Sequence, residues 1–245
     1  MLSAISYAFR EQETPAAARS VAAAGLTHIE LWRGHPGGLA ECAGPEAPET
    51  VAARLKADLA GAGVAVSAYC VGGITDESPA QIERWGRIAL GLGTDILTGC
   101  LLRPERAAEI NGILSAIGVR YAIENHKGIH FEGLAPYQAL FAGDRYPQLG
   151  INVDTGHFIL AEVDPAQAVA RMGARVFHVH LKDVPKPGDK RYHHSCPIGH
   201  GRLDVPAVLE ALAGIGYAGP ISIEYEDQDP LPALKSSLQY LRGRL

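Results

Sequence analysis

The sequence predicts an α/β fold, a single (β/α)8 TIM barrel that occupies residues 1–245. Short apolar runs alternate eight times with helical stretches, and 245 residues suit the roughly 250 that eight strand–helix units need. The last four strand positions each bring a carboxylate or an imidazole to the end of an apolar run. These residues are Glu124, Asp154, His180 and Glu224. An open doubly wound sheet would alternate in the same way, but it explains a ring of acids less simply.

The elements follow in chain order without a break in composition that would divide the chain into two domains. The expected strands lie at 2–8, 27–31, 64–70, 95–99, 119–124, 150–154, 176–182 and 221–225. The expected helices lie at about 14–24, 48–61, 78–91, 104–116, 133–142, 164–172, 205–213 and 230–242. Three helices carry a start signal, a capping side chain before a proline, at Thr14-Pro15, Ser78-Pro79 and Asp164-Pro165. Glycines suited to a left-handed helix cap are Gly25, Gly63, Gly93, Gly118 and Gly216.

Composition excludes several function classes. A net charge of -5, a pI of about 6.0 and the lack of a Lys/Arg run argue against partners such as nucleic acid or a membrane surface. No apolar run approaches the length of a membrane span, and a signal peptide is not expected. The four cysteines have no paired spacing and are expected to be reduced thiols of a cytoplasmic protein: Cys42, Cys70, Cys100 and Cys196.

Two long loops leave the carboxyl ends of strands, where barrels of this kind place their sites. They span 33–47 and 183–203, and either could cover a pocket. The second is rich in histidine: His193, His194 and His200 flank Cys196. This composition suits a second metal site or a polar pocket cover, and the sequence leaves the choice open.

The four strand-end residues form a candidate metal site. Their successive separations of 30, 26 and 44 residues fit strand ends on one rim, and buried acids need a compensating cation. Three carboxylates and one imidazole favour a divalent Mn, Mg, Co or Zn ion. Taken singly, a strand-end Glu is commonly a solvated or ion-paired residue. A strand His is commonly a hydrogen-bonded core residue, which we expect of His178, one layer below His180.

The motifs ENH, DTGH, HVHLKD, a G-x-G stretch and IEYE resemble the sugar-phosphate isomerase/epimerase family of the xylose isomerase-like TIM barrel superfamily. The resemblance extends from Ile5 to the last helix. It implies that the four strand-end residues bind the metal and that Glu124 and Glu224 form the acid/base pair. The implied activity belongs to carbohydrate metabolism. It is a divalent-metal-dependent isomerase or epimerase of a small keto sugar or related polyol, which abstracts an α-proton through a metal-stabilised enediolate.

Five residues are expected to bind substrate. His157, one helical turn beyond Asp154, contacts a substrate oxygen by the same resemblance, or else faces solvent. Lys182 would hold a phosphate, carboxylate or hydroxyl, or lie solvated at the rim. Glu30 would orient a ligand or bind hydroxyls, or form a salt bridge, and Trp32 would give a sugar an apolar platform. Arg202 stands where many relatives have acidic residues, and it predicts an anionic group on the substrate.

Other function classes stay open. A dehydratase of the inosose or 3-dehydroshikimate type would remove the same proton and then expel a β-hydroxyl. A non-catalytic sugar-binding barrel would need neither base. An endonuclease IV-like nuclease would need extra histidines at strand ends where this chain has Tyr69-Cys70 and Gly99-Cys100. The sequence leaves open the substrate, its stereochemistry, the metal and the oligomeric state, for which a homodimer is possible.

Overall fold

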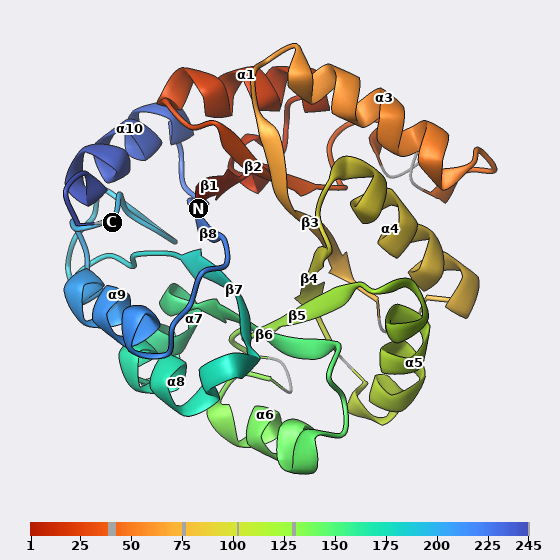
Figure 1. Ribbon diagram of the computed structural model, residues 1–245. Helices are drawn as coiled ribbons and strands as arrows, with labels where there is room; N and C mark the ends of the chain where they lie inside the picture. Colours follow the sequence, from red (N-terminus) through yellow and green to blue (C-terminus); the bar gives the residue numbers. More distant parts are fainter. Residues whose placement is uncertain (39–42, 75–76, 102, 129–130, 245) are drawn as a thin grey trace.

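The chain folds into a closed barrel of eight parallel strands surrounded by helices (Figure 1), as a computed structural model describes it for residues 1–38, 43–74, 77–101, 103–128 and 131–244. Each strand pairs with the next along the chain, and the first pairs with the last. The predicted (β/α)8 TIM barrel is therefore confirmed. None of the helices within the described residues is long and apolar enough to cross a lipid bilayer.

The strands are short and almost completely buried. They are β1 (Leu2–Ile5), β2 (His28–Trp32), β3 (Ala65–Gly73), β4 (Ile96–Cys100), β5 (Arg120–Glu124), β6 (Leu149–Asp154), β7 (Val176–Leu181) and β8 (Ile221–Ile223). The α-helices are α1 (Thr14–Ala24), α3 (Pro48–Ala60), α4 (Pro79–Leu92), α5 (Ala107–Ile117), α6 (Leu134–Phe141), α7 (Thr155–Leu160), α8 (Pro165–Met172), α9 (Val205–Gly214) and α10 (Pro230–Leu241). Short 3-10 turns are η1 (Ser6–Phe9), η2 (Pro104–Arg106), η3 (Ala142–Asp144) and η4 (Gly173–Arg175).

Most helix signals act as predicted. Ser78 accepts a hydrogen bond from the backbone N–H of Gln81, and Asp164 caps α8 in the same way. The five glycines predicted to follow helices all have positive φ. The prediction for Thr14 is wrong, because Thr14 is already the first residue of α1 and the extended residue before it is Glu13, whose side chain makes no capping bond.

Several strand boundaries differ from the sequence expectation, and β3 continues to Gly73. β1 ends at Ile5, where the chain turns into η1. β8 ends at Ile223, so Glu224 follows the strand, although its N–H still donates to Leu181 O at 3.0 Å. The helix α7 directly after β6 was not expected. It forms because Asp154 Oδ1 accepts the N–H of His157 at 2.7 Å and so caps its first turn.

Two apolar clusters hold the barrel together. The larger lies between the strands and the surrounding helices. The smaller consists of Ala68, Ile96, Ala122 and Phe177. Phe177 is the extra residue of β7 where the pairing shifts, since Val176 pairs with Ile151 and His178 with Asn152. Gly150 leaves room for it, since a Cβ there would lie 2.4 Å from Phe177 Cδ2. This apolar floor supports the polar layer above it.

The polar layer above the floor is unusually rich for a barrel interior. Its inward-facing, fully buried members are Ser3, Glu30, Thr98, Asn152, His178 and Ser222. Pairing registers shift between Ile29 and Glu30 on β2 and between Ile151 and Asn152 on β6. Such bulges re-aim side chains and are common beside sites. The carboxyl-terminal rim lies directly above this layer.

Candidate metal centre

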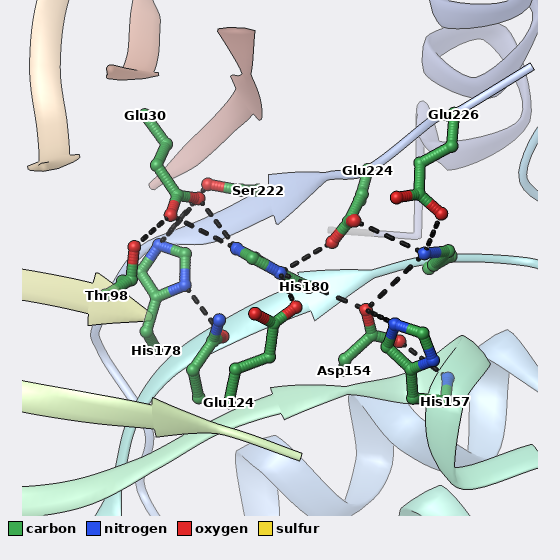
Figure 2. A network of polar contacts seen from close by, with 12 residues as sticks. Glu30, Thr98, Glu124, Asp154, His157, His178, His180, Ser222, Glu224 and Glu226 are labelled. Atoms are coloured by element: carbon green, nitrogen blue, oxygen red, sulfur yellow. Dashed lines mark hydrogen bonds and ion pairs between the residues drawn. The ribbon is translucent and has the colours of Figure 1, made fainter. Parts of the chain in front are cut away.

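Four side chains from neighbouring strands converge at the rim. Glu124 ends β5, Asp154 ends β6, His180 lies near the end of β7, and Glu224 follows β8. His180 Nδ1 lies 2.6 Å from Glu224 Oε2, 3.2 Å from Glu124 Oε1 and 4.0 Å from Asp154 Oδ2. One ligand atom from each residue lies within 4.8 Å of the others, so the four form a group that could hold a metal ion (Figure 2).

The donor set fits a divalent cation. Asp154 and His180 are 0% and 2% exposed, so solvent does not stabilise their charges. Asp154 Oδ2 is buried and has no hydrogen-bond partner, and the group closest to the buried Glu224 Oε2 is the His180 imidazole, at 2.6 Å. A buried carboxylate oxygen without a donor is costly. A hard or borderline dication at the convergence point would satisfy both oxygens and accept the imidazole nitrogen as well.

In the protein alone, protons balance part of the negative charge. Burial, helped by Glu224 and Glu124, raises the pKa of Asp154 well above its usual range. Although burial opposes it, the carboxylates of Glu30 and Glu224 raise the pKa of His180. Burial also opposes the shift of Glu224, but Lys182 and His180 hold the pKa of that carboxyl well below normal. A metal ion would replace these protons, so metal and protons compete for the centre.

Lys182 is a buried cation at the edge of the ligand cluster. Its side chain is 1% exposed, and Nζ lies 3.3 Å from Glu224 Oε1 and 3.9 Å from Asp154 Oδ2. It also forms an ion pair with Glu226. The glycine of the DTGH motif makes room for it, because a Cβ on Gly156 would lie 2.7 Å from Lys182 Cγ. Lys182 therefore offsets part of the carboxylate charge and is not a solvated rim residue.

His178 and Glu30 lie below the ligands. His178 Nδ1 is 3.0 Å from Asn152 Oδ1 and Nε2 is 3.3 Å from Ser222 Oγ, and burial lowers the pKa of His178 to about 4. Glu30 directs both carboxylate oxygens at His180 Nε2, at 3.0 and 3.1 Å. Burial opposes the shift, but the two imidazoles lower the pKa of Glu30 to about 2.

A cavity of about 300 Å³ borders the ligand cluster. Its lining includes His157, Lys182 and Glu226, together with a wall from the loop after β7: Val184, Pro185, Asp189, Tyr192, His193 and His194. His157 is 9% exposed, and its ring lies 4.0 Å from that of His126. Burial, with the charge of Lys182, lowers the pKa of His157 to about 3. His157 is thus a neutral, buried group facing the cavity rather than solvent.

The loop at 183–203 forms one wall of this cavity. Residues 39–42 of the other long loop lie outside the described residues. Sequence reasoning overlooked the residue that holds the loop at 183–203, Asp183. Its carboxylate accepts the backbone N–H groups of Gly199, Gly201 and Leu203 at 3.0, 2.8 and 2.9 Å. The available signal was its place directly after Lys182, on the opposite face of the chain.

Asn125 and Glu226 were also overlooked. Asn125 fixes the backbone of Asp154, since its Oδ1 accepts the N–H at 2.8 Å and its Nδ2 donates to the carbonyl at 2.9 Å. Glu226 pairs with Lys182 and follows Glu224 by two residues in IEYE. Both belong to motifs recognised in the sequence, ENH and IEYE, and that membership was the available signal.

Other predicted residues lie apart from the cluster in the contacts that the described residues make. Trp32 packs edge-on against Tyr7 and His35, with ring centroids 5.0 and 5.5 Å away. Arg202 is exposed, and its backbone N–H donates to Val184 O. Their proposed substrate contacts stay predictions.

Within the described residues, the histidine-rich loop brings no three metal-ligating side chains together. The groups with metal-ligand spacing there are the rim cluster and the trio of Glu30, His178 and His180. The backbone N–H groups of His193 and His194 instead donate to Asp227. Cys70, Cys100 and Cys196 are free thiols, while Cys42 lies outside the described residues.

Residues 18–244 match the family described as Xylose isomerase-like TIM barrel. The chain belongs to this family. It is 27% identical over 165 residues to an inosose dehydratase of Lacticaseibacillus casei, covering 62% of this chain and 50% of that protein. It is 31% identical over 132 residues to a rhizopine catabolism protein of Rhizobium meliloti, covering 48% and 39%. The matches thus span about half the length of these curated relatives or less.

Solved structures share the fold over nearly the whole chain. A probable 3-DHS dehydratase from Bacillus anthracis has a TM-score of 0.78 at 16% identity, covering 100% of this chain and 99% of that one. An L-ribulose 3-epimerase has a TM-score of 0.75 at 18% identity, covering 98% and 93%. A Mycobacterium smegmatis barrel in complex with magnesium has a TM-score of 0.77 at 15% identity, covering 98% and 94%.

Proposed function

We propose that the protein is a divalent-metal-dependent isomerase or epimerase of a small keto sugar or related polyol. The observation that carries the proposal is the convergence of Glu124, Asp154, His180 and Glu224. His157 and Lys182, which lie beside this cluster, line a cavity of about 300 Å³. Glu124 and Glu224 stand at the two ends of this four-strand arc and approach the His180 imidazole from opposite sides in Figure 2. Two carboxylates so placed suit removal of a proton from one face of a substrate and its return to another.

The four rim residues would hold the cation, and Mn, Mg, Co and Zn all suit three oxygens and one nitrogen. A bound dication would supply Lewis-acid stabilisation to the negative charge that develops on a substrate oxygen when the proton leaves. The family membership supports this assignment, as does the donor set with its buried Asp154 Oδ2, which has no hydrogen-bond partner.

The chain's own residues then divide the remaining work. Glu224 keeps its second oxygen, Oε1, 3.3 Å from Lys182 Nζ, and Glu124 keeps Oε2, which lies 3.8 Å from Cys100 Sγ. These second oxygens are the proposed sites of proton uptake and return. His157 would hydrogen-bond a substrate oxygen as a neutral imidazole, and Lys182 would attract substrate hydroxyl or anionic groups. The loop after β7 limits the access of water.

A dehydratase is the second candidate, and the sequence relatives favour it. Two relatives with detectable identity are an inosose dehydratase and, over 83 residues at 29% identity, a 3-dehydroshikimate dehydratase of Pseudomonas putida. The initial proton removal would be the same in both reactions. In dehydration the electrons of the broken C–H bond form a C=C bond, and the β-hydroxyl leaves with a proton as water.

Incubation of the Mn²⁺-loaded protein with keto-polyols in D₂O tests the proposal. The panel includes ketopentoses, ketohexoses, inosose and 3-dehydroshikimate. Isomerisation or epimerisation yields a product of the same formula that carries solvent deuterium on the reacting carbon. Dehydration yields a product lighter by one water. If no compound in the panel exchanges a carbon-bound proton while several bind, the barrel is a binding protein and the enzymatic proposal fails.

A further inference from the structure

A fourth carboxylate lies directly behind the metal-ligand cluster. Glu30 comes from β2, which is not a neighbour of β7 in the barrel, yet it reaches across the interior to His180. The residue is 0% exposed. Figure 2 shows its carboxylate facing Nε2 of the imidazole, on the side away from Glu224. The imidazole is therefore held between this carboxylate and those of the rim.

The contacts of Glu30 leave its orientation little freedom. Both oxygens lie within 3.1 Å of His180 Nε2, and Thr98 Oγ1 donates to Oε1. His178 Nε2 lies 3.4 Å from Oε2. A buried carboxylate needs N–H or O–H donors, and a neutral imidazole has a single N–H. When a metal ion displaces the Nδ1 proton of His180, the arrangement therefore keeps the remaining proton on Nε2, and the lone pair of Nδ1 faces the point where the three rim carboxylates converge.

We infer that Glu30 is a positioning residue that fixes the tautomer and ring orientation of His180, so that Nδ1 and not Nε2 ligates the metal. The inference rests on the metal site of the proposed function and deepens it. Glu30 was expected to bind substrate. The inference instead assigns it to the orientation of a metal ligand, because its carboxylate contacts the His180 imidazole. Carboxylates that accept the second N–H of a ligating histidine typically strengthen metal binding about 10–100-fold.

The first test compares Mn²⁺ affinities, measured from the EPR signal of free Mn²⁺ in titrations of purified variants. Glu30→Ala is expected to weaken binding about 10–100-fold. Glu30→Gln keeps the shape but loses the charge, and is expected to weaken it about tenfold. Ser222→Ala is the matched control, because it disturbs the same buried layer through His178 without contacting His180. Its affinity is expected to stay within about twofold of wild type.

The second readout is the histidine tautomer, which a merely structural role would not change. Long-range ¹H–¹⁵N NMR of the Zn²⁺-loaded, ¹⁵N-histidine-labelled protein reports which nitrogen of His180 carries the proton. In wild type we expect a protonated Nε2 with a strongly deshielded proton and a metal-bound Nδ1. In Glu30→Gln that proton signal is expected to move toward the value of a weaker hydrogen bond, while Ser222→Ala leaves it in place.

The outcomes separate this inference from the proposed function. Wild type that binds no divalent ion defeats the metal site itself. Wild type that binds normally, with Glu30→Gln unchanged in both affinity and the Nε2 proton signal, defeats the positioning role even if Glu30→Ala does not fold. An equal loss in Ser222→Ala defeats it as well. Two ions per chain, one of them lost in Glu30→Gln, would make Glu30 a ligand of a second ion held with His178 and His180.

Discussion

The two halves of the barrel rim differ in the charge that they bury. Strands β5 to β8 bring three carboxylates and an imidazole to one point. Within the described residues, the ends of β2 and β4 bring Trp32 and Cys100, and Cys70 lies near the end of β3. The halves meet where Cys100 Sγ lies 3.8 Å from Glu124 Oε2. The charged half needs compensation by cations, whereas the neutral half needs only packing.

The two halves contribute to the centre in different ways. The charged half is compensated within the structure by Lys182 and a protonated His180, and a divalent ion would complete the balance. The first half contributes to the centre from below, through Glu30 and Thr98, rather than at the rim. Under the proposed function, the second half carries the reacting groups, and the first half supports them from below.

The largest expected effect comes from removing one base of the charged half. Glu224→Gln keeps the shape and a metal-binding oxygen but cannot take a proton, so kcat is expected to fall about 10²–10⁴-fold. Steady-state kinetics on the substrate identified in D₂O measure it. Glu83→Gln is the control, because Glu83 is a half-buried glutamate on α4 that pairs with Arg87, far along the chain from the rim cluster. Near-normal turnover by Glu224→Gln would remove Glu224 from the proton-transfer role.

A smaller loss is expected where the charged half holds the loop after β7. Asp183→Ala leaves three backbone N–H groups without their charged acceptor, which is expected to cost about 2–4 kcal/mol of unfolding free energy. Denaturant unfolding measures the loss, and hydrogen exchange should rise at Gly199, Gly201 and Leu203. Asp164→Ala, which removes a helix cap, is expected to cost about 1 kcal/mol. Equal costs for the two variants would show that Asp183 anchors nothing beyond its own turn.

The barrel and the convergence of its four candidate ligands were predictable because both follow from periodic patterns. Apolar runs bounded by caps and glycines place every strand, and a residue at the end of a buried parallel strand must lie at the rim. Glu124, Asp154, His180 and Glu224 could therefore be grouped without coordinates. The helix after β6 could not, because a six-residue helix has too short a periodic pattern and depends on Asp154 acting as a cap.

The supporting contacts were less predictable because they depend on distances across the barrel. Glu30 contacts His180, which lies 150 residues later in the sequence. Spacing along the chain therefore does not reveal this partner. Asp183 holds backbone groups 16 to 20 residues away, and backbone acceptors and donors leave no mark in a sequence. Arg202 was assigned to substrate binding only because its residue type differs from that of relatives. Asp183 holds the backbone on both sides of it, at Gly201 and Leu203, and the Arg202 side chain is exposed.

Metal binding at the charged half should raise the protein's free energy of unfolding. Saturation with Mn²⁺ at 100 times Kd is expected to add about 2.7 kcal/mol to the free energy of unfolding. Asp154→Asn should lose most of this gain. The metal-free variant should itself be more stable than wild type at pH 7, by on the order of 1 kcal/mol, because burial raises the pKa of Asp154.

The expected gain in stability of metal-free Asp154→Asn follows from the linkage between proton binding and folding. A carboxyl whose folded pKa is raised contributes stability below its unfolded pKa of 3.8 and loses it as the pH rises toward the folded value. The amide of Asn keeps the cap on His157 and cannot ionise. Thermal unfolding with and without Mn²⁺, from pH 4 to pH 8, measures both effects. A metal-free Asp154→Asn protein that is less stable than wild type throughout would contradict the unfavourable buried charge.

The smallest expected effect lies in the neutral half, where the thiols should be inert. Burial, then the nearby Glu30 and Glu124, raises the pKa of Cys70 to about 12, and burial with Glu124 raises the pKa of Cys100 further. At pH 8 only about 10⁻⁴ of Cys70 is thiolate, so iodoacetamide should leave it unlabelled until the protein unfolds in guanidinium. The associated stability should persist below pH 9 and decline above it. Peptide-resolved mass spectrometry measures the labelling, and a Cys70 that reacts as fast in the folded as in the unfolded chain would show that this half of the rim is open to solvent.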